Sequence, residues 1–270
     1  MPELPEVEII RRELHSHIQG ARILQVDFRW PRVAAFPPSE VMTQRLPGHV
    51  ITDVGRRGKY LLFHLLPKAV LVVHLRMTGQ FHIVPPGTEP DKHTHVVMLL
   101  DNYQVLHYRD QRKFGRFYLV SQAEEIIGPL GPEPLDPNWQ PQDLAQALKH
   151  RRAPIKSLLL DQRVVAGLGN IYADEALFLA HIHPLRAGNT LSPEEIQALH
   201  HAIRQVLNEA LAAGGSTIAT YIPPSQRQGA YQKQHRVYRR TGQPCPVCGT
   251  PIQKTRVGGR STHFCPRCQR

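Results

Sequence analysis

Residues 128–141, GPLGPEPLDPNWQP, divide the chain into two parts with different hydrophobic periodicity. The five prolines of this segment favour a stiff, extended connector. Short strand-like runs precede it and helical patterns follow it. We therefore predict a boundary between two structural parts here, with the linker at 129–141.

The part before the linker is predicted to hold one helix followed by short strands. Residues 3–19 fit a helix, with Pro5 in its first turn and Gly20 at its end. Its apolar face comprises Val7, Ile10, Leu14 and Ile18. Strand-like runs lie at 24–30, 60–66, 69–75, 95–100, 104–108 and 115–120. Several short strands separated by Gly, Pro and Asp turns favour a sandwich or barrel.

The first of these runs has the simplest alternation of side chains. Leu24, Val26, Phe28 and Trp30 alternate with polar residues, which predicts a half-buried strand with these four on the buried face.

The part after the linker has helical periodicity. Candidate helices lie at 143–150, 155–160, 170–179 and 193–211. The last is the best defined, because Ser192 and Glu195 fit a capping box and Gly214-Gly215 fits a helix end. Residues 216–235 are polar and rich in Gly, Pro and Gln, which predicts a mobile loop.

Composition and charge restrict the class of protein. The 270 residues are 41% apolar and 20% charged, which is typical of a folded chain, and no long uncharged apolar stretch predicts a membrane span. The opening MPELPEVEII is acidic and is unlike a signal peptide.

The positive charge is concentrated near the C-terminus. The chain has a formal net charge of +11, and residues 210–270 contain ten Lys or Arg and no Asp or Glu. Removing these ten charges from +11 leaves +1 for the first 209 residues. This distribution predicts a polyanionic partner, with nucleic acid as the first candidate.

Two cysteine pairs indicate a metal site. Cys245 and Cys248 form one C-x-x-C pair, Cys265 and Cys268 form the other, and sixteen residues separate them. Four thiolates at this spacing can complete a closed tetrahedron, which favours one structural Zn²⁺ over a redox or disulfide pair. The connector suits a β-hairpin that projects Arg256 and Arg260.

Six motifs occur in order along residues 2–269. They are PELPEVE (2–8), GRRGKYL (55–61), HLRMTGQF (74–81), DQRKFGRF (110–117), GLGNIYADEALF (167–178) and GGRSTHFCPRCQ (258–269). Together they closely resemble bacterial formamidopyrimidine-DNA glycosylase, also called 8-oxoguanine DNA glycosylase. The resemblance implies an α+β multidomain fold with an N-terminal helix and β-sandwich, a helix-two-turn-helix domain and a zinc-finger β-hairpin.

The resemblance also implies domain boundaries and a function. The expected domains are a catalytic domain at 1–128, the linker, a DNA-binding domain with a lesion-capping loop at 142–235, and a zinc finger at 236–270. The expected enzyme is a bifunctional DNA glycosylase and abasic-site lyase that flips out and removes 8-oxoguanine and formamidopyrimidines, then cleaves the strand by β,δ-elimination. Its expected partner is double-stranded DNA, and it is expected to be a monomer, associated with the nucleoid in the bacterial cytoplasm.

Catalytic roles follow from the same resemblance. Pro2 would be the nucleophile that forms a Schiff base, Glu3 the general acid, and Glu6 the support of that network. Lys59 would bind phosphate and assist elimination, and Arg260 would grip flanking phosphates and assist the later elimination. The amine must be unprotonated to attack, and Pro2 must be the first residue of the active form. The helix N-terminus lowers the pKa of this amine and the two glutamates raise it, so the sequence leaves the balance open.

Eight further residues match DNA contacts of the family: His74, Met77, His93, Arg112, Phe114, Arg151, Lys156 and Asn170. Met77, Arg112 and Phe114 match the trio that fills the space left by the flipped base. Thr78 lies in the same motif without a defined role.

Simpler interpretations remain open for single residues. Glu3 and Glu6 also fit a capping pair, Met77 and Phe114 fit core packing, and Asn170 fits a helix N-cap.

Two alternatives apply to the whole chain. One is an enzyme of the same fold that removes oxidised pyrimidines. The other is a non-catalytic, zinc-dependent DNA-binding protein.

Overall fold

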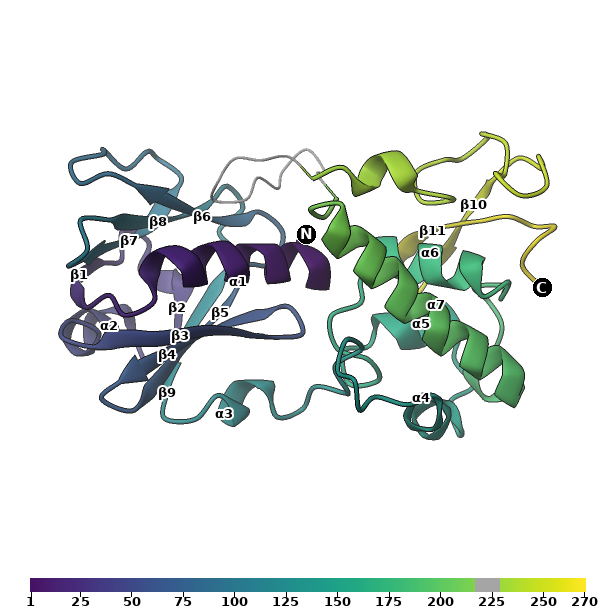
Figure 1. Cartoon of the computed structure of the whole chain (residues 1–270), viewed down its shortest axis with the longest axis horizontal. Coiled ribbons are helices and arrows are strands. Elements are labelled where there is room, and N and C mark those ends of the chain that lie inside the picture. The colour runs from purple at the N-terminus through teal and green to yellow at the C-terminus, as the bar shows by residue number, and fades with distance from the viewer. Residues whose placement is uncertain (217–228) are drawn as a thin grey trace. The chain divides into compact units, whose positions relative to one another are not determined.

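The computed structural model describes residues 1–216 and 229–270, which fall into two compact units. The first unit comprises Met1–Pro129 with Ser216 and Gly229, and the second comprises Leu130–Gly215 and Ala230–Arg270. Figure 1 identifies the elements of each unit. No helix within the described ranges is long and apolar enough to cross a membrane.

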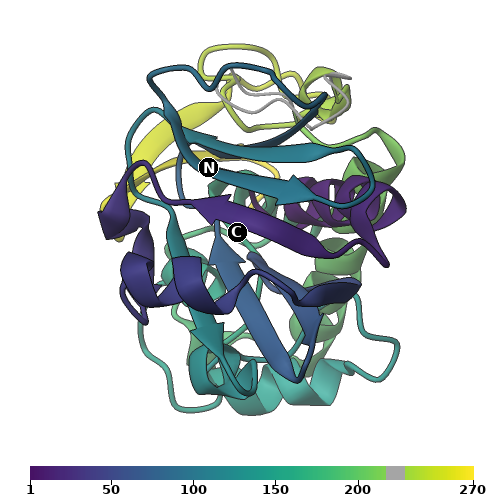
Figure 2. The ribbon, with the colours of Figure 1, turned by 90° about the vertical axis from the view of Figure 1, so that its left-hand side faces the viewer.

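The first unit is built on two β-sheets, so the sandwich prediction is confirmed. The four-stranded sheet has the order β1-β7-β8-β6, with β1 at Ile23–Asp27, β6 at Gly79–Val84, β7 at Thr94–Leu100 and β8 at Val105–Asp110. The five-stranded sheet has the order β2-β9-β5-β4-β3, with β2 at Ala34–Phe36, β3 at Val50–Arg57, β4 at Tyr60–Leu66, β5 at Ala69–His74 and β9 at Arg116–Val120. Figure 2 shows that the strands of the two sheets run in different directions.

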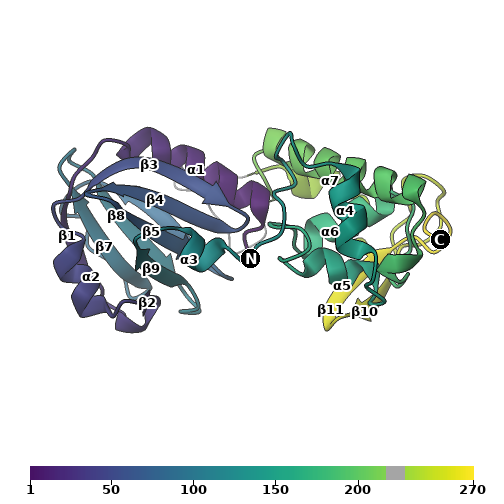
Figure 3. The ribbon, with the colours of Figure 1, turned by 90° about the horizontal axis from the view of Figure 1, so that it is seen from below.

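Helix α1, Leu4–Ile18, lies against the edge strand β3 and its neighbour β4 (Figure 3). The predicted apolar face is confirmed, since its four residues are at most 1% exposed and join the core between the sheets. The short helices α2, Ser39–Arg45, and α3, Glu124–Ile127, complete the regular helices described in this unit. The packing of α1 fixes where the start of the chain lies.

The predicted buried face of the first strand is wrong at Leu24. That side chain is 48% exposed, whereas Ile23 and Val26 are each 1% exposed. The pairing of β1 with β7 shifts between Ile23 and Gln25, and this irregularity places Ile23 and Val26 on the same buried face. The strand ends at Asp27, while Trp30 is only half-buried against the core.

The second unit is helical and carries a β-hairpin, as predicted. Its α-helices are α4, Pro141–Leu148; α5, Ile155–Leu160; α6, Asn170–Leu179; and α7, Pro193–Ala212. The hairpin pairs β10, Gln253–Val257, with β11, Arg260–Phe264. The capping box at α7 is present, since Glu195 N donates to Ser192 Oγ at 3.3 Å and Ser192 N donates to Glu195 Oε2 at 2.8 Å.

The proline-rich segment is anchored to the second unit. Trp139 is 3% exposed, and its ring lies 4.2 Å from that of His200 on α7. Backbone hydrogen bonds join Gly131 to Gln162 at 2.9 Å and Ala166 to Pro132 at 3.0 Å. Prolines stiffen this segment, and burial of its one tryptophan fixes it in place.

The loop predicted at 216–235 can be followed only at its two ends. Residues 217–228 lie outside the described residues. Ser216 is buried, and Tyr231–Gln234 form a 3₁₀ helix that buries Tyr231.

Candidate functional site

The Glu6 carboxylate holds the start of α1. Glu3 N donates to Glu6 Oε2 at 2.8 Å, and Ser216 N donates to Glu6 Oε1 at 2.9 Å. Glu3 and Glu6 are 3% and 2% exposed and form the capping box expected of a plain capping pair. Because both Glu6 oxygens accept backbone donors, Glu6 fixes the position of the residues that precede the helix.

The amino group at the start of the chain is surrounded by charged side chains. Burial lowers the pKa of the Met1 amine, and the cationic Lys59 and Arg112 lower it further, while Glu3 and Glu6 raise it. The sequence left the direction of the shift open for the amine of Pro2, the next residue. For the Met1 amine, burial is the largest cause, and the charges of four side chains act on this one group.

Lys59 and His74 lie at the same end of the five-stranded sheet, since His74 ends β5 and pairs with Tyr60, the residue after Lys59. Lys59 follows Gly58 in the tight turn between β3 and β4, and only 6% of it is exposed. Burial, with the charges of Arg76 and Lys59, lowers the pKa of His74 to about 3. The ring is therefore neutral. Its Nδ1 accepts from Arg76 N at 2.9 Å, so its proton lies on Nε2, which is a donor.

The three residues predicted to fill the DNA stack lie on two adjacent turns. Met77 is half-buried, Arg112 is exposed, and Phe114 is 46% exposed. The Arg112 guanidinium carbon lies 4.6 Å from the centre of the Phe114 ring, so these two side chains stack. Core packing does not account for Phe114, because nearly half of its surface is in solvent.

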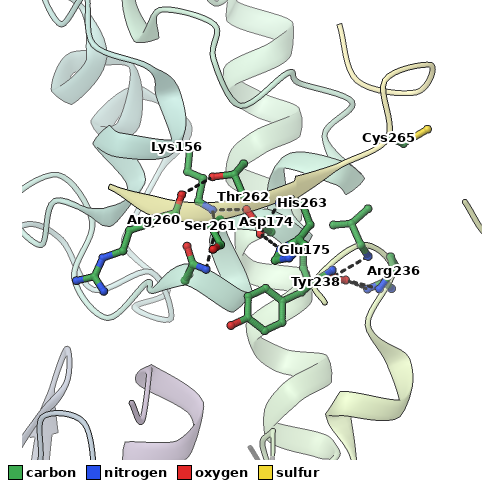
Figure 4. A network of polar contacts seen from close by, with 12 residues as sticks. Lys156, Asp174, Glu175, Arg236, Tyr238, Arg260, Ser261, Thr262, His263 and Cys265 are labelled. Carbon is green, nitrogen blue, oxygen red and sulfur yellow. Dashed lines mark hydrogen bonds and ion pairs between the residues drawn. The ribbon is translucent and has the colours of Figure 1, made fainter. Parts of the chain in front are cut away.

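Lys156 is an interior residue of the second unit. It has no exposed side-chain surface, and its Nζ lies 2.6 Å from Asp174 Oδ1, also fully buried. The same Nζ donates to the Ser261 carbonyl at 2.9 Å (Figure 4). Lys156 was predicted as a DNA contact, but in this conformation its ammonium faces protein on all sides. We assign it to the support of β11.

Asn170 supports the same point of the hairpin. Its Nδ2 donates to the Ser261 carbonyl at 2.9 Å, so that oxygen accepts from Asn170 and Lys156 together. The N-cap of α6 is Gly169, so the N-cap interpretation of Asn170 is wrong by one residue. Asn170 and Lys156, two of the predicted DNA contacts, thus bind the same carbonyl, that of the residue after Arg260.

Arg260 opens β11 after the turn Gly258-Gly259. Gly258 has φ +55°, and a Cβ there would lie 2.8 Å from Ser157 Oγ, so the turn requires glycine. Arg260 is exposed, and in Figure 4 its side chain extends away from the buried network. Arg151 is also exposed, and its guanidinium forms an ion pair with Asp161, with 3.5 Å between NH1 and Oδ2.

Two buried acids of α6, Asp174 and Glu175, each accept several hydrogen bonds, and no role was predicted for either of them from the sequence. Asp174 Oδ2 accepts from the backbone N and from Nδ1 of His263, both at 3.0 Å. Glu175 accepts backbone N–H groups of Arg236 at 2.8 Å and of Val237 and Tyr238 at 2.9 Å each. The signal was present, because an acidic pair in the otherwise apolar run IYADEALF must be paired when it is buried.

The four cysteines are arranged for a tetrahedral metal ion. Their Sγ atoms all lie within 4.8 Å of one another, with Cys245–Cys268 at 3.8 Å and Cys248–Cys265 at 3.5 Å. Thiolates about 2.3 Å from one zinc ion lie about 3.8 Å apart in a tetrahedron, so the donor set fits one structural Zn²⁺. The separations are far beyond a disulfide bond, so the disulfide alternative is wrong here.

Three family domains match the chain. Residues 1–117 match the formamidopyrimidine-DNA glycosylase N-terminal domain, and residues 130–222 match the formamidopyrimidine-DNA glycosylase H2TH domain. Residues 242–270 match a zinc finger found in FPG and IleRS.

Whole proteins match it as well. The chain is 48% identical over 273 residues to formamidopyrimidine-DNA glycosylase of Symbiobacterium thermophilum, covering 100% of this chain and 89% of that protein. It is similar to a mutant Lactococcus lactis FPG in complex with Fapy-dG-containing DNA, with TM-score 0.93, 40% identity and 100% of both chains covered. It is also similar to MutM in complex with carbocyclic 8-oxo-G-containing DNA, with TM-score 0.92, 39% identity and the same coverage.

Proposed function

The chain belongs to the formamidopyrimidine-DNA glycosylase family, and from this membership we infer that it is a base-excision repair enzyme for oxidised purines. It is a bifunctional enzyme, a DNA glycosylase and an abasic-site lyase, whose partner is damaged DNA. Its zinc finger holds one structural Zn²⁺ on four cysteines.

We propose that Pro2, freed by removal of Met1, supplies the nucleophile. The observation that carries this proposal is the half-buried Met1 amine at the start of the chain, whose pKa is lowered chiefly by burial, while Glu3 and Glu6 raise it and Lys59 and Arg112 lower it. The Pro2 nitrogen would inherit these surroundings. Burial around a secondary amine favours its uncharged form, which keeps a lone pair for attack.

The proposed first stage joins Pro2 to the sugar. The nitrogen attacks C1′ as the glycosidic C–N bond breaks, and the N–H proton that the amine loses is passed to the departing base. Glu3 gives a proton to O4′ as the sugar ring opens, which leaves an iminium between Pro2 and C1′. Glu6 keeps the chain start in position through its two backbone hydrogen bonds.

The second stage cleaves the strand. The iminium withdraws electrons, so loss of a C2′ proton expels the 3′ phosphate, and a further elimination expels the 5′ phosphate. Lys59, the His74 Nε2–H and Arg260 are proposed to hold these phosphates, which need cationic or N–H donors. Met77, Arg112 and Phe114 are proposed to fill the vacated stack, while His93, Arg151 and Asn170 contact the DNA backbone.

The domain boundaries 1–128, 129–141, 142–235 and 236–270 are part of this proposal. So are a monomeric state and action at the bacterial nucleoid in the cytoplasm, where chromosomal DNA lies.

Strand cleavage of defined duplexes tests the function. The protein should cleave an 8-oxoguanine duplex, leave phosphate at both ends of the gap, and cleave a thymine glycol duplex far more slowly. Pro2→Gly and Glu3→Gln should abolish base release. Equal or faster release of thymine glycol would favour the pyrimidine enzyme, and absence of any release would favour a binding protein.

A further inference from the structure

We propose that Thr78 and Asp110 are positioning residues that lock Met77, Arg112 and Phe114 into one rigid wedge. This inference rests on the proposed function, in which those three side chains enter the DNA stack. It gives Thr78 a role that the sequence left undefined.

The Asp110 carboxylate organises the loop that carries Arg112 and Phe114. Asp110 is 1% exposed and ends β8. Its Oδ1 accepts from Arg112 N at 3.1 Å, and its Oδ2 accepts from Phe114 N at 2.9 Å and Gly115 N at 2.8 Å. The Tyr108 hydroxyl also donates to Oδ2 at 3.3 Å. Residues 111–115 therefore wrap around one buried carboxylate.

The Thr78 hydroxyl joins this loop to the turn that carries Met77. Its Oγ1 donates to Asp110 Oδ1 and accepts from Arg112 N at 3.1 Å. One hydroxyl thus binds both Asp110 and Arg112, which lie 32 and 34 residues after Thr78 in the sequence. Because Thr78 directly follows Met77, the position of Met77 is tied to that of Arg112.

A third segment is held by the Asp110 backbone. Asp110 N donates to the His93 carbonyl at 2.9 Å, and the His95 Nε2 donates to the Asp110 carbonyl at 2.8 Å. Met77 is adjacent to Thr78, and hydrogen bonds to Asp110 hold the backbone of Arg112, Phe114 and His93. Thr78 and Asp110 together therefore fix the three wedge residues and His93, a predicted DNA contact.

The backbone beside the carboxylate has little room to adjust. A Cβ at Gly115 would lie 1.7 Å from the Tyr108 hydroxyl oxygen, so only glycine allows this close approach. Lys113 adopts φ +58°, and its Nζ lies 4.1 Å from the centre of the Trp30 ring. A left-handed non-glycine residue persists only where its surroundings fix it.

The hydrogen bonds of Thr78 and Asp110 hold the backbone that carries the exposed side chains of the wedge. Asp110 and Thr78 are buried, whereas the side chains of Arg112 and Phe114 face solvent. A wedge that is already ordered loses less conformational entropy when it enters the base stack. Loss of the Thr78 hydroxyl should loosen the Met77 turn from the Arg112 loop and slow the extrusion of a paired base.

Single-turnover rates on two substrates test the inference. The first substrate is a duplex with 8-oxoguanine opposite cytosine, in which the wedge must replace the base. The second is single-stranded DNA with a preformed abasic site, which has no base to extrude. The measured quantity is the ratio of the first rate to the second. Partial misfolding lowers both rates together and leaves this ratio unchanged.

For Thr78→Val we expect the ratio to fall by about tenfold or more. Asp110→Asn should lower it as well, because an amide nitrogen cannot accept the backbone donors. Thr78→Ser, which keeps the hydroxyl, should restore most of the ratio. The matched control is Thr52→Val, which removes a hydroxyl on β3 that donates to the His64 carbonyl on β4 at 3.1 Å.

A parental ratio in Thr78→Val, within twofold, would overturn the inference, as would failure of Thr78→Ser to recover. Inactivity of the parent protein on both substrates would instead refute the proposed function, so the two failures are distinguishable.

Discussion

Lys156 and Asp174 form an ion pair in which neither side chain has any exposed surface, with 2.6 Å between Nζ and Oδ1. Each partner also binds β11, through the Ser261 carbonyl and through His263. The pair therefore joins α5 and α6 to the strand that begins at Arg260.

Replacement of Lys156 should destabilise the second unit. Lys156→Met leaves the Asp174 charge buried without its cation, and we expect the free energy of unfolding to fall by about 3–5 kcal/mol. Urea denaturation followed by circular dichroism measures this change. Lys254→Met, at an exposed position on β10, is the matched control and should change it by less than about 0.5 kcal/mol. Equal changes in the free energy of unfolding for the two variants would show that the buried ion pair does not stabilise the second unit.

Arg260→Ala should reduce the salt dependence of DNA binding. Loss of one phosphate contact lowers the slope of log affinity against log salt concentration by about 0.9. Titrations of duplex DNA at several salt concentrations give this slope. Arg12→Ala, an exposed arginine paired with Glu8 on α1, should leave it at the parental value. An unchanged slope for Arg260→Ala would remove its role as a phosphate contact.

Removal of zinc should disrupt the hairpin and leave most helices folded. The thiolates hold residues 245–268 together, and without the ion they repel one another. The expected result of chelation is loss of DNA binding with most helical circular dichroism retained. Full DNA binding by zinc-free protein would mean that the hairpin does not need the metal.

His74 should make the protein less stable in mild acid. Its pKa is lowered to about 3 in the folded state, whereas an unfolded histidine titrates near 6.5. Between these values the unfolded chain binds one more proton, so folding stability falls as the pH falls, by about 1.4 kcal/mol per pH unit. The excess loss should disappear in His74→Gln, as followed by urea unfolding at pH 7, 6 and 5. Parallel pH profiles of the two proteins would contradict a neutral, buried His74.

Local chemical signals allowed much of the second unit to be predicted. The Ser192–Glu195 capping box and the C-x-x-C pairs depend on residues close in sequence, and both appear as expected. The α1 face was predictable for the same reason, because α1 contributes one continuous stripe to the core.

Features that depend on distant partners were not predictable. Strand β3 was missed because polar Thr52 and Asp53 and a register shift between Ile51 and Asp53 interrupt its alternation. The burial of Lys156 depends on Asp174 and Ser261, and no local pattern indicates that pairing. Similarly, the role of Thr78 depends on an aspartate 32 residues away.

The most direct test of the central claim is covalent trapping followed by peptide mass spectrometry. The protein is incubated with an 8-oxoguanine duplex and borohydride, which reduces an iminium to a stable amine. We expect a protein–DNA adduct whose attachment point is the nitrogen of Pro2, in chains that have lost Met1. An adduct on a lysine, or full lyase activity in chains that retain Met1, would contradict it.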